Sequence, residues 1–210
     1  MEDNIYEFEF TDENAGVFNI SLVDNPAIMV DMIFFNSEEQ TIWKMESEEK
    51  RTIVSPLLIP NQKIYRQNIN GNGAGYVFAS ELTIEKLQQN FSKQRYGSTS
   101  NINHNFSAPI EDVYVSESWI VTDPNNDKAN ALGFKNLPKG TWMVSIKIDN
   151  KEVWNDYIKT GKVKGISIDA LLGAKRVKNN NELINFKMNK KTISDIVAMA
   201  VQKVALEAEL

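Results

Sequence analysis

Short strand-like segments, each followed by turn residues, are the feature that most constrains this fold. Residues 16–23, GVFNISLV, alternate between two faces, and the following DNPA turns the chain. Residues 40–46 and 51–60 flank a charged stretch and predict a hairpin. Pro56 and Pro60 predict that the second strand of this hairpin lies at a sheet edge or ends there, because proline cannot donate a ladder hydrogen bond.

Helix-like segments interrupt these strands. Ser80 is placed as the N-cap of a helix over 80–91, with an apolar stripe made of Leu82, Ile84, Leu87 and Phe91. A second helix is predicted over 150–161, ended by Gly161. Further strands are predicted over 63–67, 101–106, 112–121, 140–149 and 163–178. We therefore expect a mostly β chain with inserted helices (α+β) and mainly antiparallel pairing, in which a closed or nearly closed barrel would remove exposed edges.

The C-terminal tail differs from the rest of the chain. Residues 192–208 place apolar side chains at the spacing of an amphipathic helix, after the polar run NNNE. Such a helix either docks on the core or forms an arm that engages a partner. We accordingly divide the chain into a β domain over 1–186 and an amphipathic helix over 187–210.

Composition excludes several classes of function. The net charge of −5 and the lack of a basic tract argue against binding to nucleic acid. No signal peptide and no apolar run of about 20 residues is present, so we expect a soluble cytoplasmic protein without membrane contact. The absence of cysteine excludes a thiol nucleophile, and one histidine cannot build a multi-histidine metal site. We expect no metal and no cofactor, and residues 123–134 fail as a calcium loop because Lys128 stands where glycine is needed.

Any histidine chemistry must use His104. If 102–106 is extended, His104 shares a face with Ile102 and Phe106 and points inward or into a cleft, although a satisfied core histidine has the same pattern. Glu117 lies on the more apolar face of strand 113–121, unless a bulge turns it outward. A buried acid requires a partner, and the histidine is available.

Ser167 and Asp169 share the less apolar face of their strand. A nucleophile, a base and an orienting acid are thus all present as residue types, but their spacing alone does not assemble them. The sequence around Ser167 is equally typical of a structural serine in a β-strand. The basic run that contains Lys175 and Arg176 is either a solvated strand end or a source of positive charge or a backbone N–H for an oxyanion.

Several stretches taken together resemble a known family. They are ISLVDNPAI (20–28), NHN (103–105), ESWIV (117–121), KGTWMVSIKI (139–148) and VWNDYIKTGKVKGISI (153–168). In this order they resemble the phage serine protease family typified by XkdF, the prohead (procapsid maturation) proteases. The resemblance implies a fold like that of the herpesvirus assemblins, a β-barrel surrounded by helices.

The resemblance implies a serine endopeptidase with Ser167 as nucleophile and His104 as base. The herpesvirus branch uses a second histidine, which this chain lacks, so the third member is expected to be an acid: Glu117 first, then Asp169, then Asp112. The implied substrates are scaffold and major capsid proteins and the protease itself, inside the procapsid of an infected bacterium, with self-association as a further expectation. The alternatives are a non-catalytic assembly or scaffold-binding protein on the same fold and, less favoured, a metallohydrolase.

Overall fold

The computed structural model describes residues 4–11, 15–26, 44–47 and 50–177. The chain divides into two units, residues 1–175 and 176–210, and the fold of the first is described here. The predicted tail helix over 187–210 lies outside the described residues. Among the described residues, no helix is long and apolar enough to cross a membrane, and no cluster of three or more histidine or acidic side chains could hold a metal ion.

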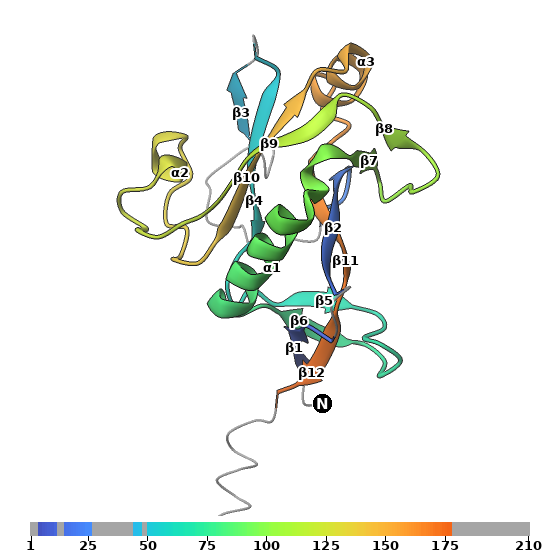
Figure 1. Cartoon of the computed structure of the whole chain (residues 1–210), viewed down its shortest axis with the longest axis vertical. Helices are drawn as coiled ribbons and strands as arrows, with labels where there is room; N and C mark the ends of the chain where they lie inside the picture. The colour runs from blue at the N-terminus through green and yellow to red at the C-terminus, as the bar shows by residue number, and fades with distance from the viewer. Residues whose placement is uncertain (1–3, 12–14, 27–43, 48–49, 178–210) are drawn as a thin grey trace, which may run out of the picture. The chain divides into compact units, whose positions relative to one another are not determined.

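The described strands form three four-stranded sheets (Figure 1). One sheet contains, in spatial order, β12 (Gly173–Arg176), β1 (Ile5–Glu9), β6 (Gly75–Phe78) and β5 (Ile64–Arg66). A second contains β3 (Lys44–Ser47), β4 (Thr52–Leu58), β10 (Trp142–Ile148) and β9 (Val113–Ile120). The third, which we call the site sheet, contains β11 (Gly165–Leu171), β2 (Gly16–Val23), β7 (Ser100–Ile102) and β8 (Pro109–Ile110).

The mostly β prediction is confirmed, but none of the three sheets closes into a barrel among the described residues. Most of the pairings between described strands are antiparallel, as expected, whereas β1 pairs with β6 and β2 pairs with β7 in parallel. Parallel neighbours need long connections, and residues 24–99 separate β2 from β7. Strands from distant parts of the sequence are therefore brought side by side in the site sheet.

The predicted hairpin is present as β3 and β4. Its second strand does not lie at an edge, but it does end, at Leu58, before Pro60. β4 lies inside its sheet, between β3 and β10. The register between β4 and β10 shifts beside Pro56, since Trp142 faces Leu58 while the next residue, Met143, faces Pro56. This irregularity takes one residue out of the ladder, and an interior strand accommodates the proline there.

The longest helix, α1 (Glu81–Gln94), begins where the sequence predicted. Ser80 caps it by accepting a hydrogen bond from the backbone N–H of Thr83 at 3.4 Å. Its buried residues are Ile84, Leu87 and Phe91, one apolar stripe at helical spacing, whereas Leu82 is exposed. Phe91 packs edge-on against Trp142 of β10 with ring centroids 5.5 Å apart, and α1 also contacts β2 and β9. The helix thus joins the site sheet to the second sheet through one core.

The remaining helical segments are short. A 3-10 turn, η2 (Tyr96–Ser98), follows α1, and α2 (Lys128–Ala131) lies in the loop after β9. The helix predicted over 150–161 is present as α3 (Lys151–Val153) continued by the π-helical turn η3 (Trp154–Ile158). Gly161, with a φ of 69°, ends this region and leads toward β11.

Candidate active site

The site sheet brings together polar side chains from three strands. β11 and β2 pair antiparallel, so Ser167 lies directly opposite Ser21 and Asp169 directly opposite Asn19. β2 and β7 pair in parallel, with Ser21 beside Asn101. Directly opposed residues share one face of a sheet, so these five side chains form one polar group.

A bulge in β2 sets which side chains join this group. Asp169 pairs with Asn19, but the next residue of β11 pairs with Val17, so Phe18 is an extra residue in β2. Val17 and Ile20 both belong to the hydrophobic core, which simple alternation would not allow. The bulge leaves Phe18 exposed next to Asn19 and keeps Asn19 and Ser21 on the polar face.

His104 is held in a turn after β7, so the extended segment expected over 102–106 is wrong. β7 ends at Ile102, and both Asn103 and His104 have left-handed backbone, with φ of 50° and 59°. The backbone N–H of Asn103 donates to the Leu22 carbonyl at 2.9 Å, and its side chain exchanges two hydrogen bonds with Asp24. Asparagine tolerates this conformation better than most residues, and here it fastens the turn to the end of β2.

The Asp169 carboxylate is the centre of the hydrogen-bond network. Oδ1 accepts from Nδ1 of His104. Oδ2 accepts from Asn19 Nδ2 at 2.7 Å, from the Ser21 hydroxyl at 2.7 Å and from Asn101 Nδ2 at 3.3 Å. The residue is only 5% exposed. Burial alone would raise the pKa of Asp169, but the hydrogen bonds from Asn19, Ser21 and His104 outweigh it and hold that pKa below its usual value, so the group is a carboxylate at neutral pH.

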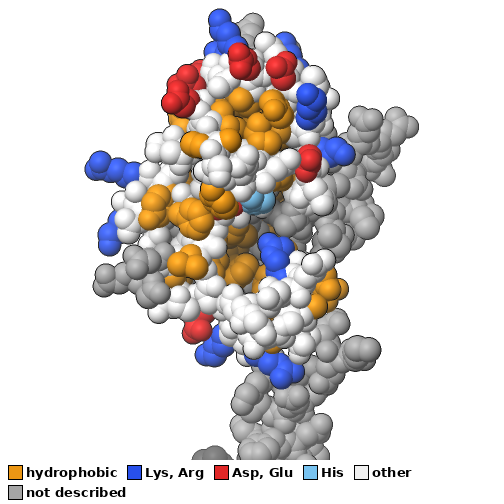
Figure 2. Space-filling model, turned by 90° about the vertical axis from the view of Figure 1, so that its right-hand side faces the viewer, with side chains coloured by type: hydrophobic (Ala, Val, Ile, Leu, Met, Phe, Trp, Pro, Cys, Tyr) orange, Lys and Arg blue, Asp and Glu red, His pale blue; other side chains and the backbone are white. Residues whose placement is uncertain are grey.

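This contact determines the chemistry available to His104. A carboxylate can only accept, so Nδ1 carries a proton, and in the neutral imidazole Nε2 then keeps its lone pair. The side chain is 42% exposed, and the imidazole is visible at the surface among hydrophobic side chains (Figure 2). Phe106, two residues after His104, packs against Phe18 of β2 with ring centroids 6.0 Å apart, and both are exposed. An imidazole oriented by a buried acid, with one nitrogen free, has the arrangement of a general base.

A family model described as "Putative phage serine protease XkdF" matches residues 40–176. The chain belongs to this family. No match to the chain was found among curated proteins or among solved structures. The matched range includes His104, Ser167 and Asp169, whereas β2, which supplies Asn19 and Ser21, precedes it.

In this XkdF-family chain, Ser167 lies beside the Asp–His pair. It occupies the face of β11 that carries Asp169, and it is half-buried, whereas Ser21 opposite it is fully buried. Among the described residues, the Ser167 hydroxyl forms no hydrogen bond, with His104 or with any other group. Looser contacts of this kind are common in catalytic groups without substrate.

Glu117, the acid ranked first from the sequence, points elsewhere. Ser145 pairs with Glu117 and the next residue, Ile146, pairs with Val115, so β9 carries a bulge at Ser116. The bulge turns Glu117 outward, where its exposed carboxylate forms an ion pair with Lys128. Of the two alternatives for Glu117, the structure has the bulge that turns it outward, and the carboxylate that binds His104 is that of Asp169.

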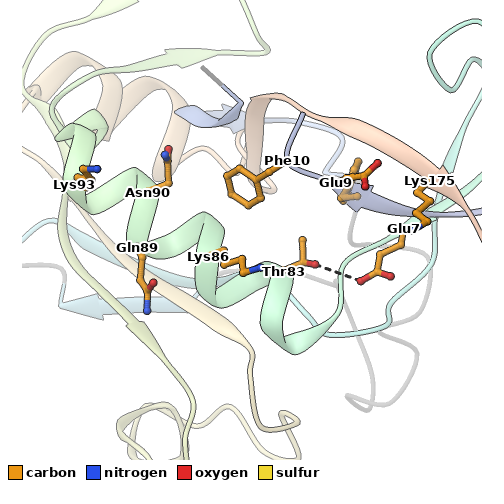
Figure 3. Close-up of a pocket in the computed structure, with 10 residues that line it drawn as sticks. Glu7, Glu9, Phe10, Thr83, Lys86, Gln89, Asn90, Lys93 and Lys175 are labelled. Carbon is orange, nitrogen blue, oxygen red and sulfur yellow. Dashed lines mark hydrogen bonds between the residues drawn. The ribbon is translucent and has the colours of Figure 1, made fainter. Parts of the chain in front are cut away.

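The other predicted site residues have separate surroundings. Asp112 lies in an exposed turn before β9, where its carbonyl accepts the backbone N–H groups of Asp149 and Asn150. Lys175 lines a groove of about 650 Å³ between β1 and α1, whose wall also includes Glu7 and Lys86 (Figure 3). Arg176 is exposed at the end of β12. Among the described residues, none of these three side chains forms a hydrogen bond or an ion pair with Asp169 or His104.

Sequence reasoning missed the three side chains that hold Asp169, namely Asn19, Ser21 and Asn101. A signal was present: Asn19 and Ser21 are polar residues in a strand otherwise made of apolar residues and one glycine. Buried polar groups require partners, so their presence pointed to an internal network. Their partner, however, is 148 to 150 residues away in the sequence, which no local pattern shows.

Proposed function

We propose that this protein is a serine endopeptidase in which Ser167 is the nucleophile, His104 the general base and Asp169 the acid that orients the histidine. The observation that carries the proposal is the hydrogen bond between Nδ1 of the sole histidine and a buried carboxylate on the same strand face as Ser167. Membership of a family described as phage serine proteases agrees with it. Asp169 replaces Glu117 as the third member.

The proposed reaction is acyl transfer. The Ser167 hydroxyl attacks the carbonyl carbon of a peptide bond while Nε2 of His104 takes its proton, and the carbonyl electrons move onto the oxygen. The imidazolium then protonates the leaving amine as the C–N bond breaks, which leaves an ester on Ser167. Water, deprotonated by the same nitrogen, hydrolyses the ester. Asp169 keeps its negative charge throughout and stabilises the imidazolium. The oxyanion role of the Lys175 and Arg176 region is retained as a prediction.

For the biological role, we propose cleavage of scaffold and capsid-protein segments, and of the protease itself, inside the procapsid of an infected bacterium. The basis is the family membership together with the resemblance of its motifs to prohead proteases. A relation to the assemblin barrel is part of the same proposal. A solved structure of the chain would test this relation by showing whether the sheets close.

The experiment is covalent labelling with a fluorophosphonate, which reacts with activated serines and requires no known substrate. Wild type is expected to be labelled, and mass spectrometry is expected to place the label on Ser167. Ser167→Ala and His104→Ala should both lose it. Co-expression with the phage capsid and scaffold proteins should give shortened products with wild type and none with Ser167→Ala. Labelling of a different serine, or identical products from both proteins, would refute the assignment.

A further inference from the structure

The hydroxyl of Ser21 contacts both members of the Asp–His pair. Its Oγ lies 2.7 Å from Asp169 Oδ2 and 3.3 Å from His104 Nδ1. It also lies 2.7 Å from the side-chain oxygen of Asn101. Ser21 itself is 0% exposed, so its oxygen is enclosed by these groups and cannot meet a substrate.

The Ser21 oxygen can donate one hydrogen bond and accept others. A hydroxyl has one proton, which can go to Asp169 or to Asn101, and the charged carboxylate is the stronger acceptor. Donation to Asp169 leaves the lone pairs of Oγ free, and one of them faces the Nδ1–H of His104. The imidazole N–H therefore has Asp169 Oδ1 as its main acceptor and Ser21 Oγ as a second. Two acceptors, on neighbouring strands, fix the direction of the N–H better than one.

We infer that Ser21 is a positioning residue that locks the ring of His104 against Asp169, so that the Nδ1–H tautomer is kept and Nε2 is directed to the serine opposite Ser21 in the sheet, Ser167. This rests on the proposed function for its catalytic consequence. The register is the reason for the direction: Ser21 and Ser167 form one opposed pair of β2 and β11. Half-buried Ser167 is the nucleophile of the proposed reaction, and fully buried Ser21 orients His104, its base.

The site sheet offers a matched control in Ser100. It is 4% exposed, it lies on the neighbouring strand β7, and its hydroxyl donates to the Ile20 carbonyl at 2.6 Å. Ser100→Ala therefore removes a buried hydroxyl and its hydrogen bond from the same sheet without touching the Asp–His pair. A purely structural role of Ser21 would make the two alanine variants behave alike.

The test compares wild type, Ser21→Ala, Ser21→Thr and Ser100→Ala. Nitrogen-15 NMR of the imidazole reports the tautomer without ambiguity, because His104 is the sole histidine of the chain. Ser21→Ala is expected to let the imidazole turn away from Asp169 part of the time, which gives a mixture of tautomers. It is also expected to slow fluorophosphonate labelling roughly 10- to 100-fold, the value of one hydrogen bond to a charged group. Ser21→Thr, which keeps the hydroxyl, should restore both, and Ser100→Ala should match wild type.

The inference is overturned if Ser21→Ala keeps the wild-type tautomer and labelling rate, or if Ser100→Ala changes both as much. Should Ser21→Ala fail to fold, Ser21→Cys keeps the volume with a much weaker donor and carries the same comparison. Absence of labelling in wild type would refute the proposed function instead. The tautomer comparison would then still decide whether Ser21 positions His104, since it needs no reaction.

Discussion

Replacing Asp169 with asparagine tests the site most directly, because the new side chain is nearly isosteric and differs mainly in charge and in one pair of donors. The carboxylate accepts four hydrogen bonds, three at Oδ2 and one at Oδ1. The amide has one acceptor oxygen. Placing that oxygen at Oδ2 keeps the contacts with Asn19, Ser21 and Asn101 and sets the NH2 group against His104. The opposite orientation sets the NH2 group against three donors and is worse.

In the better orientation, Nδ1 of His104 faces a donor and must become the acceptor. The proton then moves to Nε2, which removes the lone pair that the mechanism needs. The lost charge-assisted hydrogen bond predicts a fall of about 1.5–3 kcal/mol in the free energy of unfolding. The wrong tautomer predicts a loss of activity of roughly 10⁴-fold, the size known for the same change in the chymotrypsin-type triad.

The assay combines chemical denaturation, nitrogen-15 NMR of the single imidazole and the rate of fluorophosphonate labelling. Asp149→Asn is the control, because Asp149 is also an ion-paired aspartate but has a side chain that is 40% exposed and pairs with Lys147 and Arg51. It should leave the tautomer and the labelling rate unchanged. The reasoning is refuted if Asp169→Asn keeps the proton on Nδ1 or is labelled at the wild-type rate.

Two further predictions follow from the charges. Because the pKa of Asp169 is lower in the folded chain than its ordinary value of about 3.9, its contribution to stability is fully present above that value and is lost as pH falls through the lower, folded-state pKa. Denaturation at a series of pH values measures the difference in free energy of unfolding between wild type and Asp169→Asn. This difference should be constant above about pH 5 and shrink below about pH 4. A difference that grows on acidification would contradict the prediction. Glu117→Gln should change the free energy of unfolding by less than about 1 kcal/mol and leave labelling unchanged, because its ion pair with Lys128 is exposed; loss of labelling would return Glu117 to the site.

Much of the local structure could be predicted from the sequence because it depends on neighbouring residues. The N-cap at Ser80, the helix that follows it and the hairpin of β3 and β4 all agree with local patterns. The predictions that were wrong concern segments whose conformation or place in the sheet depends on a neighbouring strand. Pro56 lies in an interior strand because the ladder shifts beside it, and His104 lies in a turn because Asn103 is fastened to the end of β2.

The residue types that the proposed reaction needs can be read from the sequence: the sole histidine, and a serine and an aspartate two residues apart on one strand face. Which acid binds the histidine was decided by tertiary structure. Side chains in a strand alternate with a period of two, so one extra residue reverses their direction, and the bulge in β9 turned Glu117 outward for this reason. Asp169 binds His104 because β2 lies between β11 and β7, a pairing of segments up to 150 residues apart that only the folded sheet makes.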